Sequence, residues 1–192
     1  MENRYSDFGS YYPHNTLKNL WQLSRYVPAA RLQMECLNRG RNHDKYPACD
    51  PLAPRHYDMD YLFAVTIPSS PLIWMEMSHL GEEDARKLQA IIAAYLPHQQ
   101  RIIQSRVSPI GRKPDGMSFT GFQMEEENGN GYLLLFRENT EADSFDYALC
   151  GLQEAKFQLL ASNSAAEITA FENRVRLHTE APRSYALWRY TR

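Results

Sequence analysis

Residues 31–80 read RLQMECLNRGRNHDKYPACDPLAPRHYDMDYLFAVTIPSSPLIWMEMSHL, and this stretch decides the fold. It holds an apolar strand at Leu32–Leu37, a polar loop over residues 38–56, an apolar segment at Tyr57–Ser70, and a second apolar strand at Leu72–Glu76. Both strands run into polar side chains. In (β/α) architectures the loops that follow the strands form one functional face. The stretch therefore predicts two neighbouring strands of a parallel sheet with a polar rim.

The segment from Tyr57 to Ser70 fits either a strand or a buried helix. Phe63–Ile67 is rich in β-prone residues, whereas Asp58 or Asp60 can cap a helix. We favour the helix, because two prolines end the segment at residues 68–71 and the next strand starts at once.

Helices are also predicted on both sides of this stretch. One is capped by Asn15 or Thr16 and runs to about Tyr26. Another begins at Glu82, where three carboxylates fall in the first turn, and Pro97 either kinks it or starts a second helix. Residues 1–106 are thus expected to form the final βα units of a (β/α)8 barrel. The barrel is incomplete, because two parallel strands cannot close one.

The pattern changes near Arg106 to short strands joined by polar turns. A hairpin connection is predicted at Glu125–Gly131, between strands at Phe119–Met124 and Tyr132–Arg137. Further strands are expected at Tyr147–Leu152, Lys156–Ala161, Ile168–Phe171, Arg174–Thr179 and Tyr185–Tyr190. Residues 107–192 therefore predict a small antiparallel β-sandwich, and the fold class is α/β followed by all-β.

Composition narrows the function. The chain has 192 residues and a net charge of −2, which favours neither nucleic acid nor a membrane as a partner. The start of the chain lacks the apolar region of a signal peptide. Three cysteines without paired spacing argue against a disulfide framework or a zinc site, although a Cys36–Cys49 bridge stays an alternative. The sequence has no phosphate-binding glycine loop or other cofactor motif, so no cofactor is predicted.

The loop after the first strand supplies three candidate substrate-binding residues, Asn38, Arg41 and Asp44. Together, these three side chains supply donors and acceptors of hydrogen bonds, which suits a ligand with many hydroxyl groups. The alternative is a solvated loop in which Asn and Asp only stabilise turns.

The second strand supplies Trp74 and Glu76, followed by Ser78. In an extended strand Trp74 and Glu76 point to the same side. An indole face beside a carboxylate can hold a sugar ring by its C–H face and its hydroxyls. The alternative is a core tryptophan beside an ion-paired glutamate.

His56, Asp58 and Asp60 are candidate ligands of a metal ion. In an extended segment these side chains would share one face and could approach an ion. In the favoured helix the aspartates are capping residues, so no metal site is predicted.

Three segments, in this order, resemble the end of an α-galactosidase-type glycoside hydrolase of the melibiase-like clan. They are Thr16–Pro28, the loop Leu-Asn-Arg-Gly-Arg-Asn-His-Asp at residues 37–44, and Asp60–Leu80. The resemblance implies the last barrel strands, a rim loop and a barrel helix, followed by a C-terminal β-sandwich.

The family resemblance also implies what this chain contributes. These enzymes are retaining hydrolases with two aspartates on earlier barrel strands, the nucleophile usually in a Lys-x-Asp context. Neither aspartate context occurs here, so no catalytic residue is carried over. Only a rim role is implied, for Asn38, Arg41 and Asp44 after the first strand and for Glu76 and Ser78 after the second.

Three functions follow from these predictions. The first is the C-terminal portion of such a hydrolase, which is inactive alone and binds a galactoside-like carbohydrate together with the upstream barrel. The second is a non-catalytic carbohydrate-binding or interaction module, and the third is a purely structural domain. Oligomeric state and compartment stay open, and the family resemblance allows a periplasmic or extracellular location.

Overall fold

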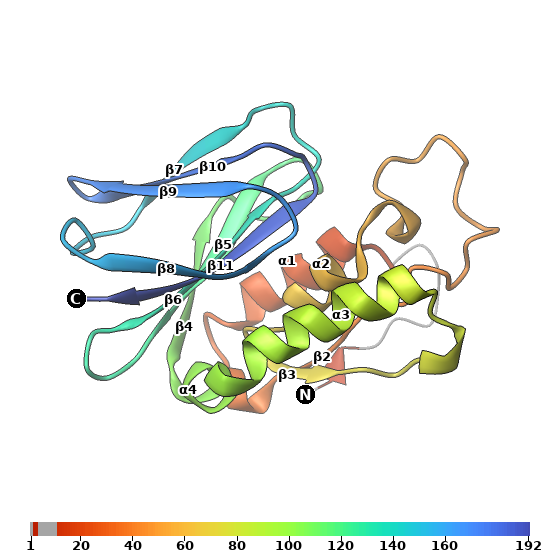
Figure 1. Ribbon diagram of the computed structural model, residues 1–192, viewed down its shortest axis with the longest axis horizontal. Coiled ribbons are helices and arrows are strands. Elements are labelled where there is room, and N and C mark those ends of the chain that lie inside the picture. Colours follow the sequence, from red (N-terminus) through yellow and green to blue (C-terminus); the bar gives the residue numbers. More distant parts are fainter. Residues whose placement is uncertain (1, 4–10) are drawn as a thin grey trace.

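The computed structural model describes residues 2–3 and 11–192, without the side chains of residues 2, 3 and 79. The first part of the chain alternates strands with helices: β1 (Glu2–Asn3), α1 (Pro13–Leu23), β2 (Gln33–Glu35), α2 (Met59–Ala64), β3 (Ser70–Leu72), α3 (Glu82–Tyr95) and α4 (Gln99–Gln104). Short 3-10 turns lie between them: η1 (Ala29–Arg31), η2 (Pro54–His56), η3 (Met77–His79) and η4 (Leu96–His98). Figure 1 shows these elements in one half of the molecule.

The second part of the chain consists of strands: β4 (Arg106–Gly111), β5 (Phe119–Glu125), β6 (Gly131–Arg137), β7 (Ser144–Ala148), β8 (Lys156–Ser162), β9 (Ala166–Phe171), β10 (Arg174–Thr179) and β11 (Ser184–Thr191). Five of them pair in the order β4-β5-β6-β11-β8, which we call the large sheet. The other three pair as β7-β10-β9. Both sheets are antiparallel, and the predicted sandwich is present.

The strands β1, β2 and β3 form a separate parallel sheet in chain order. Helix α1 contacts β4, α2 contacts β11 and α3 contacts β8, so the helices lie between this parallel sheet and the large sheet. The α/β expectation is confirmed for these strands and helices. Membership of a barrel stays a prediction.

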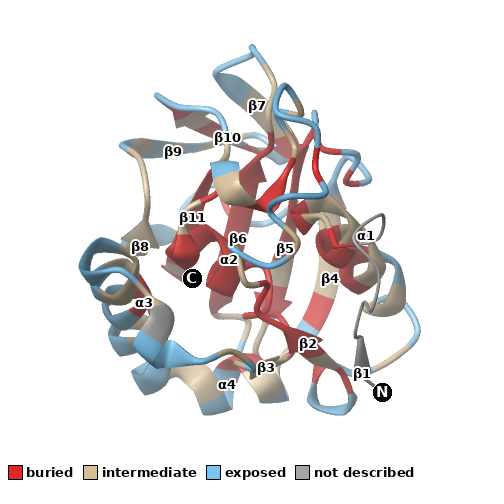
Figure 2. Cartoon of the chain, turned by 90° about the vertical axis from the view of Figure 1, so that its right-hand side faces the viewer, coloured by how far each residue is buried: buried red, intermediate tan, exposed pale blue. Residues whose placement is uncertain are grey.

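The two faces of the large sheet are both covered. On β6, Tyr132, Leu134 and Phe136 belong to the core that includes the helices. Leu133 and Leu135, which alternate with them, pack in a second core with β7, β9 and β10. Every residue of β6 is buried (Figure 2). Its apolar run at residues 132–136 fits a strand that is covered on both faces.

Several element boundaries differ from the prediction. Helix α1 begins at Pro13, before the expected caps Asn15 and Thr16, because a proline fits the first helical position and has no N–H to leave unbonded. Helix α2 confirms the helical alternative, but it ends at Ala64, and the residues that follow it form turns. Pro97 interrupts the next helix with the 3-10 turn η4, and α4 follows.

Two strands of the second half were misplaced or missed. β4 contains Pro109 and ends at Gly111, a pattern that predicts a turn, but an edge strand tolerates proline because one side of its backbone needs no partner. β7 lies at Ser144–Ala148 instead of Tyr147–Leu152. There the pairing with β10, which joins Tyr147 to Val175, decides the register.

Candidate functional site

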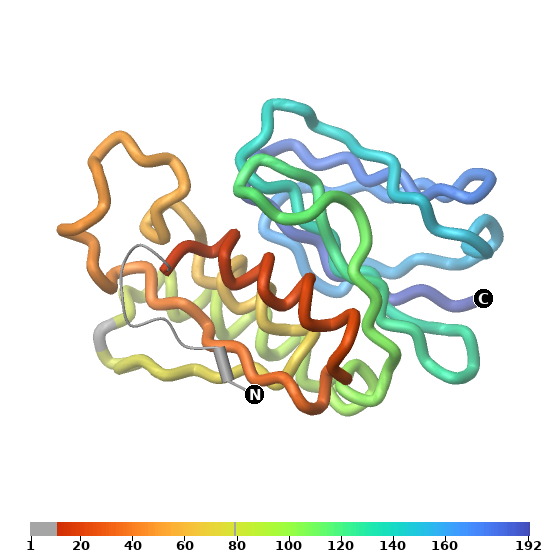
Figure 3. The backbone as a smooth tube through the Cα atoms, turned by 180° about the vertical axis from the view of Figure 1, so that it is seen from behind, coloured from red at the N-terminus to blue at the C-terminus, as the bar shows by residue number. Residues whose placement is uncertain are grey.

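The polar rim lies at the carboxyl ends of β2 and β3. We use "rim" for the loops that follow these strands, residues 38–53 and 73–81. The first loop projects away from the rest of the fold, as Figures 1 and 3 show from opposite sides. Parallel strands bring the ends of both loops to one edge of the sheet, so the two predicted clusters are neighbours.

Asn38 and Arg41 converge on Tyr11, which precedes α1. The Asn38 backbone N–H donates a 2.7 Å hydrogen bond to the Tyr11 hydroxyl. The Arg41 guanidinium lies over the Tyr11 ring, 5.1 Å from its centroid. Burial raises the pKa of Tyr11 to about 12, against the lowering effect of the Asn38 N–H, so the hydroxyl stays protonated at neutral pH. The two predicted residues therefore share one tyrosine as their support.

Glu35, at the end of β2, completes this group. Its carboxylate is 3% exposed, and its Oε1 atom lies 3.6 Å from an Arg41 nitrogen and 3.5 Å from the Tyr11 hydroxyl. A buried carboxylate is costly unless it is paired, so its position inside an apolar strand was a usable signal in the sequence. Tyr11 gave no such signal, because its place depends on contacts with residues far along the chain.

Further hydrogen bonds stabilise the conformation of the first loop. The Asn38 side-chain oxygen accepts from the Gly40 N–H at 2.9 Å, which is the turn-stabilising role of the alternative interpretation. Arg39 donates to Asp84 and to the Arg55 carbonyl, both at 2.8 Å, and so ties the loop to α3. Asp44 is exposed at the outer part of the loop.

The expected geometry of Trp74 and Glu76 is wrong. β3 ends at Leu72, so neither residue lies in a strand that would point both side chains the same way. The chain leaves the sheet because Leu72 is the last residue paired with β2, and a 3-10 turn follows at Met77. Trp74 is 58% exposed, and Glu76 and Ser78 are also exposed. The core-tryptophan alternative is therefore also wrong.

His56, Asp58 and Asp60 are not arranged as a metal site. Asp58 pairs with Lys87 at 3.0 Å, and Asp60 is buried in α2 with its Oδ2 atom 3.4 Å from the Tyr185 hydroxyl. Burial raises the pKa of Asp60, with the charge of Asp58 adding to the effect. Among the described residues, no three His, Cys, Asp or Glu side chains gather closely enough to hold an ion.

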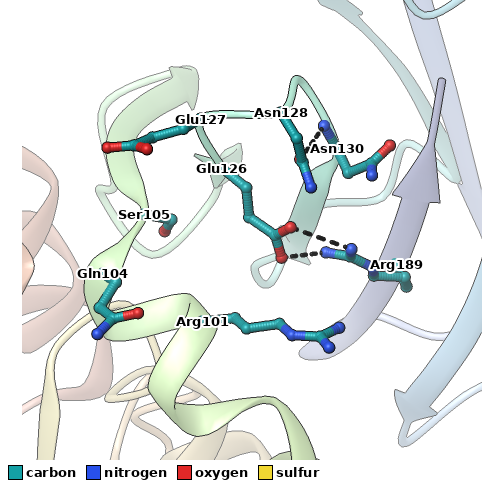
Figure 4. A pocket seen from close by; sticks show the side chains of 8 residues that line it. All are labelled: Arg101, Gln104, Ser105, Glu126, Glu127, Asn128, Asn130 and Arg189. Atoms are coloured by element: carbon teal, nitrogen blue, oxygen red, sulfur yellow. Dashed lines mark hydrogen bonds and ion pairs between the residues drawn. The ribbon is translucent and has the colours of Figure 1, made fainter.

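A second polar concavity, which the sequence analysis did not single out, lies between α4 and the β5–β6 hairpin (Figure 4). We call it the α4 cleft; its volume is about 750 Å³. Its lining residues are Arg101, Gln104 and Ser105 from α4 and its carboxyl-terminal cap, Glu126, Glu127, Asn128 and Asn130 from the hairpin, and Arg189 from β11. Hairpin turns are rich in polar residues for solubility alone, so the sequence held no specific signal for this cleft.

The three cysteines are free, which removes the Cys36–Cys49 alternative. No helix in the described part of the chain combines the length and apolarity needed to cross a membrane.

The fold has counterparts among solved structures. The galactosidase domain of an α-galactosidase–sucrose kinase, AgaSK, matches 88% of this chain with a TM-score of 0.58 at 9% sequence identity. A debranching enzyme of Nostoc punctiforme matches 82% with a TM-score of 0.50 at 7% identity. The fold resembles part of an α-galactosidase-type glycoside hydrolase.

This likeness confirms, at the level of the fold, the resemblance seen in the sequence. The chain covers 25% of the AgaSK domain chain and 35% of the debranching enzyme. It therefore spans only a minor part of the proteins that it resembles. No family model matches the chain, and no curated protein matches it in sequence.

Proposed function

We propose that this chain is the C-terminal portion of a retaining glycoside hydrolase of the α-galactosidase type. It supplies rim loops to the substrate site and an accessory β-sandwich, and it needs an upstream barrel for activity. The observation that carries the proposal is the parallel sheet β1-β2-β3, which has its helices on one face and a polar rim at the carboxyl ends of its strands.

The composition of β2 supports a barrel origin for this sheet. Met34 and Cys36 belong to the core shared with the helices. Gln33 and Glu35 alternate with them and therefore point to the other face of the sheet. In a (β/α) barrel that other face is the interior, whose upper end is the substrate site. Glu35, the last residue of β2, lies at this upper end, where a polar side chain fits a substrate site.

The edges of the parallel sheet support the same conclusion. A sheet of three short parallel strands leaves unpaired N–H and C=O groups at both edges, and closure by further strands would satisfy them. The two structural neighbours, a galactosidase domain and a debranching enzyme, are longer chains, in keeping with a chain that acts as part of a longer one.

The assay uses a chromogenic α-galactoside with this chain alone and with the chain joined to the upstream sequence of its locus. We expect hydrolysis only in the joined protein, because a closed barrel is needed to place two carboxyl groups across one glycosidic bond. Full activity in the chain alone would show that no missing barrel is needed. An upstream sequence without barrel strands would contradict the enzyme proposal.

A non-catalytic carbohydrate-binding module is the second candidate, favoured by the exposed Trp74 indole in the rim. It predicts that the chain alone binds galactosides, that Trp74→Ala removes the binding, and that no upstream fusion is hydrolytic. The structural-domain alternative instead predicts no sugar binding in either form.

A further inference from the structure

The α4 cleft lies at the end of the parallel sheet opposite to the rim. Helix α4 packs beside η1, which leads into the amino-terminal end of β2, whereas the rim follows the carboxyl ends of the strands. Figures 1 and 3 place α4 and the projecting loop at opposite sides of the helical layer. In (β/α) folds the amino-terminal face is not the catalytic face. A ligand in this cleft would therefore be separate from the proposed substrate site.

Most charges around the cleft are already paired. Arg189 holds the Glu126 carboxylate with two hydrogen bonds of 2.5 and 3.2 Å, and both side chains are largely buried. Arg106 and Arg192 both pair with Glu125, at 2.7 and 3.3 Å.

Arg101 is not part of these ion pairs. Within the described part of the chain, no carboxylate lies within ion-pair distance of it. Figure 4 shows its side chain running along the wall of the cleft towards Arg189, while the carboxylate of Glu127 points away on the other side of Glu126. The charge of Arg101 still favours the ionised Glu126 carboxyl group, but no carboxylate of the described residues lies at ion-pair distance from its guanidinium.

Both arginines of the cleft also act on a neighbouring histidine. Burial lowers the pKa of His98, the charges of Arg189 and Arg101 lower it further, and the charge of Glu126 opposes them. The His98 ring nitrogen Nδ1 lies 3.0 Å from the hydroxyl of Tyr132, whose ring is covered by Arg189 at 4.6 Å.

Neutral amide side chains also line the cleft. Gln104 lies one helical turn from Arg101 on α4, and Figure 4 shows the Asn128 side chain reaching into the cleft from the hairpin. Amides of this kind both donate to and accept from hydroxyl groups. At about 750 Å³ the space has the size of a small-molecule site, but its lining is polar where such sites are usually apolar. A hydrophilic ligand fits it better than an apolar one.

We propose that the α4 cleft is a second ligand site, which binds the oxyanion group of a hydroxylated small molecule such as a sugar acid or a sugar phosphate. Arg101 is the anchoring cation, because a guanidinium matches a carboxylate or a phosphate with two parallel hydrogen bonds. The amide of Gln104 contacts the hydroxyls, and Asn128, whose Oδ1 atom already accepts a 3.0 Å hydrogen bond from the Asn130 N–H, closes the cleft on the hairpin side. This site does not depend on the proposed hydrolase function.

The test is an NMR titration of the complete isotope-labelled chain with glucuronate, glucose 6-phosphate and glucose in separate arms. We expect saturable shifts at Arg101, Gln104 and Asn128 with at least one of the two anions, and the comparison between them identifies a carboxylate or a phosphate ligand. Glucose should bind at least 10-fold more weakly, because it lacks the charge. Equal shifts with glucose, or no saturable shifts with either anion, would overturn the proposal.

The matched variants are Arg101→Gln and Arg86→Gln. Both arginines are exposed on helices, and Arg86 lies outside the cleft on α3. We expect Arg101→Gln to weaken anion binding about 10-fold or more and Arg86→Gln to leave it unchanged. Equal affinities in the two variants would contradict the role of Arg101. Circular dichroism melts of both proteins check that the fold is intact.

Discussion

At the scale of single residues, Glu138 is a buried carboxyl group whose pKa lies well above the usual value. It follows β6 and is 1% exposed, and its Oε2 atom accepts hydrogen bonds from the N–H groups of Asp115 and Ser118 at 3.2 and 3.0 Å. Its other oxygen has no partner among the described residues. Burial raises the pKa of Glu138 to about 7, and these N–H groups only partly oppose the effect. The side chain thus loses its proton near neutral pH in the folded protein.

Glu138→Gln should flatten the dependence of stability on pH. An unfolded glutamate titrates near pH 4.3, so between that pH and about 7 the folded state binds a proton that the unfolded state has lost. The wild-type free energy of unfolding therefore falls as pH rises through this window, by about 2–3 kcal/mol between pH 5 and pH 8. The glutamine variant should lack this part of the loss, as urea unfolding at the two pH values would measure.

The control for this prediction is Glu180→Gln, at an exposed position in the turn before β11. It should keep the wild-type slope. If Glu138→Gln and wild type lose stability in parallel as pH rises, the buried carboxyl group is not the cause.

The proposed role of Arg41 in substrate binding also rests on a single side chain. In the joined, active protein, Arg41→Ala should raise KM for a galactoside about 10-fold through the loss of charged hydrogen bonds to hydroxyls. Lys45→Ala, exposed on the same loop, should leave KM unchanged. Because Arg41 also lies 3.6 Å from the Glu35 carboxylate, the unfolding free energy must be measured beside the kinetics. A loss of stability with an unchanged KM would assign Arg41 a structural role only.

At the scale of elements, the central strand and the edge strand of the large sheet should respond differently to the same substitution. Leu134 on β6 is fully buried in the helix-facing core, whereas Leu159 on the edge strand β8 is 39% exposed. Leu134→Ala leaves a cavity and should cost about 2–5 kcal/mol, and Leu159→Ala should cost less than about 1 kcal/mol. Denaturant unfolding of both variants checks the difference. Similar losses would mean that β6 is not sandwiched between two cores.

At the scale of the whole molecule, one hydrophobic core joins the two predicted segments. It includes residues of α1, α2 and α3 together with residues on one face of β5, β6 and β11: Phe122, Met124, Tyr132, Leu134, Phe136, Tyr185 and Leu187. The β4 strand starts at Arg106, close to the predicted boundary. The boundary in sequence therefore does not separate two independent cores.

Residues 107–192 alone should accordingly fail to fold as a stable monomer. Removal of the helices exposes a face with five large aromatic or leucine side chains on β6 and β11 alone, which favours aggregation over a soluble sandwich. Size-exclusion chromatography and a thermal melt of this segment, beside the complete chain, measure the effect. A monomer with a sharp cooperative transition would show that the sandwich is a self-sufficient domain.

Local patterns in the sequence are enough to predict the classes of structure and most of the elements. On β10, Val175 and Leu177 alternate with arginines in the sequence and are buried, and the apolar run at Tyr132–Phe136 is buried throughout, because local periodicity reports which faces meet the core. The order of segments was enough to indicate the resemblance that the fold comparison bears out. Asn38 and Arg41 were correctly placed after a strand of a parallel sheet.

Only the tertiary structure decided which side chains meet. Tyr11 contacts Glu35 and Arg41, which lie more than twenty positions away in the sequence. Leu72 is the last residue of β3 that pairs with β2. The α4 cleft likewise brings α4, a hairpin and the last strand together. Local propensity carries no information about such distant partners, because the free energy that fixes them comes from pairing and burial in the folded chain.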